Sequence, residues 1–291
     1  MKERIRPSDE VVQENIKRWN IPQPEQEYTV LIHCSTYNHG EYIKDALEGF
    51  VMQKCTYSFC AIIIDDCSTD NSPEMIRKYA EEYPDIIKPI LLGKNHMQRG
   101  ILRDPYFEKW HQRAKYIAQC EGDDHWIDPN KLQKQVDYLE GNRSVNICTH
   151  NAFRQYPDGK KVLFNKNVKT GVYSLSQCLL KGWFTPTASF LYRNNYTRSP
   201  LWEINGCSGD MAELYSNLLM GDLYYSDEVM SVYNYGTPGS MSTKTSRSLL
   251  YKRKRNLYKT VNQLTNKRYV FKISGLIIAS YVKQFIRMIV R

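Results

Sequence analysis

The chain has 291 residues, of which 42% are hydrophobic and 24% are charged, proportions that exclude an intrinsically disordered protein. No run of residues has the length and apolar character of a membrane span, and residues 1–20 lack the apolar region of a signal peptide. The eight cysteines are scattered, without a Cys-x-x-Cys pair or a partnering histidine. We therefore expect reduced thiols in a cytoplasmic protein, not a zinc site or a disulfide framework.

The net charge of +9 is unevenly distributed along the chain. Residues 244–291 contain 13 Lys or Arg and no Asp or Glu, which leaves 27 basic and 31 acidic residues in the remainder. The protein thus combines a mildly acidic body with a basic tail. Such a tail predicts contact with an anionic surface, either a membrane or a nucleic acid.

The first half of the chain predicts an α/β fold. Residues 1–27 indicate a polar helix from about Asp9 to Trp19 and a proline-rich connector. Apolar runs then predict strands at 28–35, 59–64, 86–92, 116–120 and 144–149, and helical periodicity predicts helices at 41–53, 72–83 and 128 to about 139. Because strands that are apolar throughout are buried on both faces, we expect a parallel sheet covered by helices on each side.

The pattern changes after residue 150. Asp158-Gly159 predicts a hairpin, and we expect a helix at 175–181, a strand at 188–192, a helix at 210–219 and one or two strands within 223–235. Two further helices are expected at 245–265 and 268–290. The chain is therefore divided into an N-terminal extension (1–27), a main domain (28–243) and a basic helical tail (244–291).

Polar side chains follow three of the expected strands. They are Ser35-Thr36-Tyr37-Asn38, Asp65-Asp66, and Glu121 with Asp123 and Asp124. Because ligands bind outside the carboxyl ends of parallel strands, we expect the three clusters to meet at one edge of the sheet. A tyrosine for a base, a carboxylate for a base edge or ribose, and an acidic pair for a metal on a diphosphate predict a nucleoside diphosphate site.

The carboxylates at 121–124 imply a cation. Like charges this close repel one another, so in a folded site some of them would be protonated unless a cation compensates them. Mg²⁺ or Mn²⁺, hard ions that take oxygen ligands and share them with substrate phosphates, fit this need. The alternative is a solvated acidic turn, which the two accompanying clusters disfavour.

Four stretches carry a resemblance to a known family. They are residues 35–38 with Tyr42, residues 64–72 (Ile-Asp-Asp-Cys-Ser-Thr-Asp-Asn-Ser), residues 121–135 (beginning Glu-Gly-Asp-Asp-His-Trp) and Gly209-Asp210. Through them, residues 28–243 resemble a family 2 glycosyltransferase with the GT-A fold, of the bacterial type that assembles surface polysaccharides. The resemblance implies a Rossmann-like, mostly parallel α/β sheet flanked by helices. Its 28–150 half would bind the nucleotide sugar and its 151–243 half the acceptor.

The resemblance also implies a nucleotide site. Tyr37 would stack on the base, with Ser35, Thr36 and Asn38 beside it. Asp66 would bind the base edge, and Asp65 or Asp123 would bind the ribose.

The same resemblance gives the acidic motif a metal. Asp124 would be the direct protein ligand of Mn²⁺ or Mg²⁺ on the two phosphates, with Asp123 as a second candidate. Glu121 stands where an aspartate is usual in the family. Glutamate keeps the charge on a longer arm, so its contact to ribose or metal is left open.

Inverting transfer needs one more carboxylate, which removes the proton of the acceptor hydroxyl as it attacks the anomeric carbon. The resemblance assigns this role to Asp210, at the start of the 210–219 helix. The alternative is that Asp210 caps that helix.

Two further regions are candidates for substrate contacts. Lys94 and Arg99, with Arg103 nearby, lie in a basic segment that would touch the diphosphate or the acceptor, unless it is an ordinary solvated loop. His125 and Trp126 follow the acidic motif and are expected to shape the acceptor or sugar pocket.

Residues 233–242 resemble the family's lid loop. Asn234 and Tyr235 stand where relatives often carry Arg and His, which leaves the lid's contribution to metal or phosphate binding open.

The tail has two interpretations. In the 268–290 helix, Lys272, Lys283, Arg287 and Arg291 form a stripe beside a wide apolar face, which suits a helix in an anionic membrane interface. The alternative is packing on the catalytic domain or on another subunit of a homo-oligomer. Nucleic-acid binding is not expected, because no recognised fold or aromatic platform accompanies the charge.

The sequence thus predicts a metal-dependent, inverting hexosyltransferase-type enzyme. It would move a sugar from a nucleotide-diphospho-sugar, with a UDP-sugar favoured, to a hydroxyl of a glycan or lipid-linked acceptor in cell-surface polysaccharide synthesis. We expect it in the cytoplasm, with peripheral contact to the inner membrane face as an option. One alternative is a nucleotidyltransferase, which should carry a Gly-rich basic loop that residues 35–42 lack. The other is a catalytically silent nucleotide-sugar-binding or scaffold protein, against which Asp124 and Asp210 argue.

Overall fold

The computed structural model describes residues 4–195, 201, 209–237 and 246–289. Its strands are β1 (Tyr28–Thr36), β2 (Phe59–Asp65), β3 (Ile87–Leu91), β4 (Ala114–Gln119), β5 (His125–Trp126), β6 (Val145–Gln155), β7 (Lys161–Leu163), β8 (Gly171–Tyr173), β9 (Leu191–Arg193) and β10 (Asp222–Asn234). Its α-helices are α1 (Asp9–Arg18), α2 (Ile43–Val51), α3 (Ser72–Glu82), α4 (His96–Arg99), α5 (Glu108–Gln112), α6 (Lys131–Gly141), α7 (Leu175–Lys181), α8 (Gly209–Met220), α10 (Arg247–Leu264) and α11 (Val270–Ile289). Two short 3-10 helices are η1 (Asp104–Tyr106) and η2 (Thr187–Ser189).

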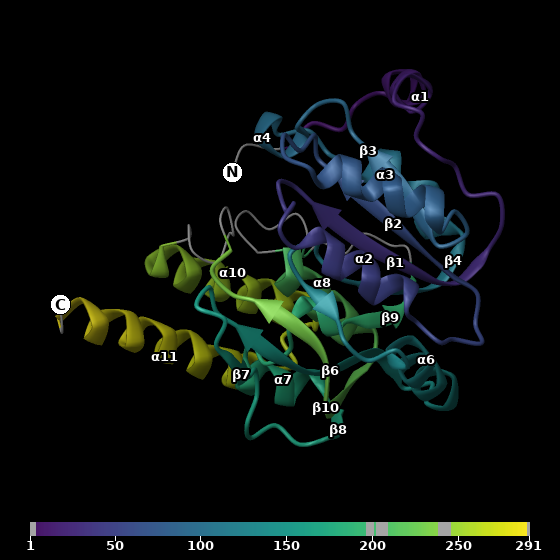
Figure 1. Cartoon of the computed structure of the whole chain (residues 1–291). Helices are drawn as coiled ribbons and strands as arrows, with labels where there is room; N and C mark the ends of the chain where they lie inside the picture. Colours follow the sequence, from purple (N-terminus) through teal and green to yellow (C-terminus); the bar gives the residue numbers. More distant parts are fainter. Residues whose placement is uncertain (1–3, 196–200, 202–208, 238–245, 290–291) are drawn as a thin grey trace.

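The strands of the described residues form one mixed sheet in the order β3-β2-β1-β4-β9-β6-β10-β5, with β7 on β6 and β8 on β10. The strands β3, β2, β1 and β4 are parallel to one another, and the long strands β6 and β10 are also parallel to each other. The short strand β9 runs antiparallel between β4 and β6 and joins these two parallel groups. The predicted α/β fold with a largely parallel sheet flanked by helices is confirmed (Figure 1).

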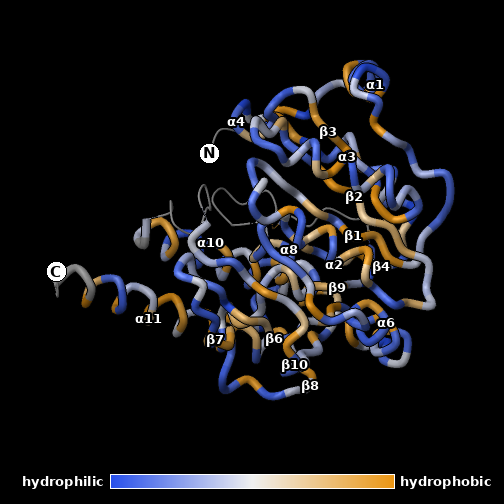
Figure 2. Tube along the Cα trace, in the orientation of Figure 1, coloured by the Kyte–Doolittle hydropathy of each residue, from blue (hydrophilic) through white to orange (hydrophobic). Residues whose placement is uncertain are grey.

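Alternate residues of the central strands pack on opposite faces of the sheet, as the pleat of a β-strand requires. Val30 and Ile32 of β1 pack with α2, α3 and α6, whereas Leu31 joins a second cluster with α7, α8 and the segment around α5. The hydrophobic colour of β1, β2 and β4 in Figure 2 follows from this burial on both faces. The apolar runs that predicted these strands therefore form the centre of the core.

Both ends of the chain contribute to this core. Val12 and Ile21 of the N-terminal extension belong to the cluster that contains Leu31. Leu257, Tyr258 and Val261 of α10 and Ile273 of α11 belong to the same cluster. One face of α10 and one face of α11 therefore pack on the main domain, as the second interpretation of the tail expected.

Several elements differ from the sequence prediction. Strand β6 continues to Gln155, and residues 187–189 form η2 before β9, because the Ser189 amide donates to the carbonyl of Pro186 and closes a turn. The segment between β3 and β4, expected as a loop, contains α4, η1 and α5. The short strands β5 and β8 were not predicted, and residues 245 and 290 of the tail helices lie outside the described residues.

Candidate active site

The three polar clusters meet where β1, β2 and β4 end. Thr36 of β1 pairs with Asp65 of β2, and the amide of Asp66 donates to the Thr36 carbonyl at 3.1 Å. On the other side of β1, the amide of Gly122 donates to the Ser35 carbonyl at 2.9 Å. Because β2 and β4 are both parallel to β1, their carboxyl ends lie at the same edge of the sheet, as predicted.

No side chain larger than that of glycine fits at position 122. A Cβ there would lie 2.6 Å from Oγ1 of Thr36 and 2.7 Å from its Cβ. This close approach brings the end of β1 and the acidic motif together.

Asp65 and Asp66 are each about 1% exposed, and both already have partners. Asp65 accepts from the amide of Ser68 at 2.9 Å and from the Ser68 hydroxyl, and burial raises the pKa of this carboxyl. Asp66 accepts from the amides of His96 and Met97 at 2.8 and 3.0 Å, so it fixes the start of α4. Sequence reasoning did not anticipate either contact, and the assignment of these carboxylates to ribose and base stays a prediction.

Tyr37 and Asn38 lie on a turn beside this pair. The partly buried Tyr37 accepts from Gln98 through its hydroxyl at 3.2 Å. Asn38 has a φ of 55°, a left-handed conformation that asparagine tolerates better than most residues, and its side chain accepts from the amide of Thr69 at 2.8 Å. The turn after β1 and the turn after β2 are thus joined, and the ring of Tyr37 lies at their surface.

Arg103 places a cation beside this site. Its guanidinium lies 3.5 Å from the Ser35 hydroxyl, and both Asp66 and Glu121 act on its charge. Burial lowers the pKa of Arg103, and these carboxylates partly offset that effect. Lys94 and Arg99, the predicted diphosphate contacts, are exposed, and within the described residues their side chains form no hydrogen bond or ion pair. The position of Arg103 therefore makes it the better candidate for an anionic ligand.

The acidic motif is crowded with negative charge. Asp124 is 2% exposed, and burial, followed by the charges of Asp123 and Glu121, holds the pKa of this carboxyl well above its usual range. Glu121 is exposed on one side, yet desolvation by the protein around its carboxyl, then the charge of Asp123 and then that of Asp210, raise the pKa of this group, which Arg103 lowers. The repulsion expected from the sequence is therefore present.

The end of β10 holds this motif in place. The backbone amide of Asn234 donates to Oδ1 of Asp124 at 2.9 Å, and the Asn234 side chain donates to the Asp123 carbonyl at 2.7 Å. The hydroxyl of Thr237 donates to Oδ2 of Asp123 at 2.9 Å. The first residues of the predicted lid segment thus contact the acidic motif, while residues 238–242 lie outside the described residues.

The donor set fits a divalent ion that is shared with a ligand. Among the described residues, no three histidine, cysteine or acidic side chains converge on a point that could hold a metal ion by themselves. Asp123 and Asp124 each use one carboxylate oxygen in the contacts above. Mg²⁺ and similar ions are commonly held by one or two carboxylates together with substrate phosphates, which is the arrangement this motif can provide.

Asp210 lies in the first turn of α8, where its Oδ1 accepts from the amide of Met211 at 3.0 Å. The side chain is partly exposed, and its charge raises the pKa of Glu121. Asp210, from the second half of the main domain, therefore lies within electrostatic range of the acidic motif. The contact to Met211 shows that Asp210 also serves the start of the helix.

The two residues that follow the acidic motif differ in environment. His125 is partly exposed, and burial lowers the pKa of its imidazole. Trp126 is 2% exposed, packs edge-on against Phe50 and donates through its indole nitrogen to the Ala188 carbonyl at 2.8 Å. The assignment of Trp126 to an acceptor or sugar pocket is therefore wrong, because its ring fills the core between α2 and β5.

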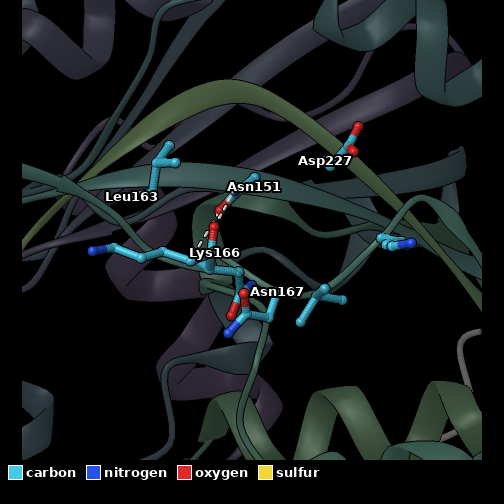
Figure 3. A pocket seen from close by; sticks show the side chains of 8 residues that line it. Asn151, Leu163, Lys166, Asn167 and Asp227 are labelled. Atoms are coloured by element: carbon cyan, nitrogen blue, oxygen red, sulfur yellow. Dashed lines mark hydrogen bonds between the residues drawn. The ribbon is translucent and has the colours of Figure 1, made fainter.

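A separate pocket of about 450 Å³ lies beside β6, β7 and β10 (Figure 3). It is lined by Asn151, Leu163, Asp227 and residues 165–169. None of the predicted site residues lines it. The candidate active site is therefore the region where β1, β2 and β4 end, not this pocket.

Comparison with known proteins agrees with this geometry. The family model for glycosyl transferase family 2 matches residues 32–212. An uncharacterized protein of Mycobacterium tuberculosis is 41% identical over 126 residues, 43% of this chain and 36% of that protein. The putative teichuronic acid biosynthesis glycosyltransferase TuaG of Bacillus subtilis is 29% identical over 110 residues, 38% of this chain and 41% of that protein. The matched region thus spans well under half the length of these relatives.

Solved structures give the same result for the fold. S. aureus TarS 1–349 in complex with UDP-GlcNAc has a TM-score of 0.60 at 14% identity, over 88% of this chain and 73% of that chain. The mannosyltransferase PcManGT from Pyrobaculum calidifontis, in complex with GDP-Man and Mn²⁺, has a TM-score of 0.53 at 13% identity, over 94% of this chain and 80% of that chain. At these identities the likeness establishes the GT-A fold. Because the family model matches more than half of this chain, the chain belongs to glycosyl transferase family 2.

Proposed function

We propose that the chain is a metal-dependent, inverting glycosyltransferase that uses a nucleotide-diphospho-sugar. The observation that carries this proposal is the position of the acidic motif where β1 and β2 end, with Asp123 and Asp124 held there by Thr237 and Asn234 from the second half of the main domain. The complexes of TarS with UDP-GlcNAc and of PcManGT with GDP-Man and Mn²⁺ support a nucleotide-sugar donor and a divalent ion. A UDP-sugar is our first choice of donor.

The strand ends provide the donor site in this proposal. The ring of Tyr37 would stack on the base, with Ser35, Thr36 and Asn38 beside it and Asp66 at the base edge. Arg103, next to Ser35, places a guanidinium where it can bind a phosphate. Asp124 and Asp123 would hold Mn²⁺ or Mg²⁺, which when bound supplies positive charge for the leaving diphosphate.

The transfer step is assigned to Asp210. Its carboxylate accepts the proton of the acceptor hydroxyl, whose oxygen forms the new bond to the anomeric carbon while the bond from that carbon to the diphosphate oxygen breaks. The nucleoside diphosphate leaves with the electron pair, and inversion follows because attack and departure occur on opposite faces of the sugar.

The acceptor is proposed to be a hydroxyl of a glycan or lipid-linked sugar in cell-surface polysaccharide synthesis. The match to TuaG, whose name places it in teichuronic acid biosynthesis, supports this class of acceptor.

The test is release of nucleoside diphosphate from a panel of nucleotide sugars with Mn²⁺, in the presence of glycan and lipid-linked acceptors. We expect release with one donor, and no transfer by Asp210→Asn. The matched control is Asp85→Asn, an exposed aspartate after α3, which should retain full activity. Incorporation of a nucleoside monophosphate into product would instead identify a nucleotidyltransferase. Binding of a nucleotide sugar without turnover under every acceptor condition would identify a silent binding protein.

A further inference from the structure

Helix α11 exposes a broad face that contains no charged residue. At about 100° per residue, one side of the helix carries an exposed set of apolar and small residues. They are Phe271, Ser274, Gly275, Ile278, Ala279, Tyr281, Val282, Phe285 and Ile286. Phe271 is 92% exposed, Ile278 63% and Phe285 59%. Exposed apolar residues scattered singly are ordinary, but a contiguous helix face of them marks a binding surface.

The opposite side of α11 fixes the orientation of this face. Ile273 is buried in the core cluster, and Arg255 of α10 donates to Ser280 Oγ at 3.3 Å and to Gln284 Oε1 at 2.9 Å. The same guanidinium lies 4.0 Å from the ring centroid of Tyr281. The exposed face is therefore not the result of an undocked helix. In Figure 1 the C-terminal half of α11 extends beyond the body of the molecule.

The tail that carries this face is cationic. Residues 244–291 contain 13 Lys or Arg and no acidic residue. Lys252, Lys259, Lys267, Arg268 and Lys283 are exposed. Within the described part of the chain, no basic side chain of α10 or α11 forms an ion pair with a carboxylate. Their positive charge is thus available to an anionic partner.

Charge decides between the candidate partners. In a symmetric dimer through this face, the same patch of each copy would meet the other, so the cations of one tail would approach those of its partner. An anionic lipid surface suits both the apolar face and the positive charge of the tail, because its acyl chains contact apolar residues and its headgroups bind lysines. Among the described residues, no helix has the length and apolar character needed to cross a membrane.

We propose that α11 lies in the interface of an anionic membrane, with Phe271, Ile278 and Phe285 among the acyl chains and the lysines of α10 and the following turn at the headgroups. This docking goes beyond the proposed sugar transfer and does not depend on it. It would hold the main domain beside the bilayer.

Flotation of the full chain with vesicles tests the proposal. The vesicles contain either phosphatidylcholine alone or phosphatidylcholine with about 30% phosphatidylglycerol. We expect flotation with the anionic vesicles only, and a decrease of at least about fivefold when the salt concentration is raised from about 0.1 M to about 0.5 M. Absence of flotation with anionic vesicles, or equal flotation with both compositions, would overturn the proposal.

Paired substitutions locate the surface. Ile278→Gln with Phe285→Gln should reduce flotation by about tenfold, because two exposed apolar side chains are lost from the membrane. The matched control is Val172→Gln with Met220→Gln, which changes exposed residues on β8 and α8 and should float like the wild type. Thermal melting checks that each variant is folded. Wild-type flotation of the first pair overturns the proposal. The proposal is also overturned if the protein sediments as a dimer, the first pair of substitutions dissociates that dimer, and the protein binds no vesicles.

Discussion

The buried Lys131 gives the structure a pH-dependent stability that can be calculated. Its ammonium is fully buried, donates to Oε1 of Gln135 at 2.8 Å and lies 3.9 Å from the ring centroid of Trp126. Burial lowers the pKa of Lys131 from 10.5 to about 7. No carboxylate contacts the ammonium in the described residues, so the folded protein holds this charge at a cost near neutral pH.

The sign of the effect follows from proton binding. Between the two pKa values the unfolded chain binds more protons than the folded protein, so the free energy of unfolding rises with pH. With a pKa of 10.5 in the unfolded chain and about 7 in the folded protein, linkage for one site gives a rise of about 2 kcal/mol between pH 7 and pH 9. Lys131→Met keeps most of the side-chain volume and removes the titrating group, so this contribution should disappear.

Urea denaturation at pH 7, 8 and 9, followed by tryptophan fluorescence, measures the difference. The pH slope of the wild type should exceed that of Lys131→Met by about 1 kcal/mol per pH unit. Lys44→Met, at an exposed position of α2, should keep the wild-type slope. Because the variants share every other titrating group, identical slopes for wild type and Lys131→Met would refute a depressed pKa for this buried lysine.

Three further predictions concern contacts around the site. Trp19 packs on His96 with ring centroids 5.9 Å apart. Trp19→Ala should therefore lower the free energy of unfolding by about 2 kcal/mol in urea denaturation. A change below about 0.5 kcal/mol would show that the N-terminal extension does not support α4. Asp66→Asn replaces an acceptor of two backbone amides, so it should cost about 2 kcal/mol in the same assay and weaken UDP binding. Unchanged stability there would contradict the described contacts. Asn234→Ala removes the bond to the Asp123 carbonyl, and the Mn²⁺ concentration at half-maximal activity should rise by about threefold; an unchanged requirement would separate Asn234 from the metal site.

The central sheet and the position of the site were predictable because local patterns determine them. The strands of residues 28–120 are buried on both faces and are apolar throughout, so their runs are visible without knowledge of their partners. The connecting helices show periodicity for the same reason. Once the strands were known to be parallel, the edge at which residues 35–38, 65–66 and 121–124 meet followed from topology.

Contacts between distant residues were not predictable in this way. Strand β6 continues through His150 and Asn151, although polar residues argue against a buried strand. Asn151 is accommodated there because its side chain donates to the Asn165 carbonyl at 2.9 Å and is therefore buried with a partner. The roles of Asn234 and Thr237 depend on hydrogen bonds across more than 100 residues of sequence. No local signal reports such pairs.

The misplacement of Trp126 has a physical cause. Trp126 follows a functional motif, and its amphipathic ring suits a pocket as well as a core; only the positions of Phe50 and Ala188 decide. Lys94, Arg99 and Arg103 were taken together as one basic segment, because charge alone cannot tell a partly buried guanidinium from a solvated side chain. The fold between β3 and β4 places Arg103 inward.

Calorimetric titration of UDP with and without Mn²⁺ tests the central claim most directly, since it separates the donor site from the transfer step. The wild type should bind UDP at least about tenfold more tightly with Mn²⁺, and Asp124→Asn should lose this enhancement. Asp210→Asn should bind UDP with Mn²⁺ like the wild type yet transfer no sugar from the donor identified in the panel. An Mn²⁺-independent affinity in the wild type, or an unchanged enhancement in Asp124→Asn, would contradict the assignment of the acidic motif to a metal–diphosphate site.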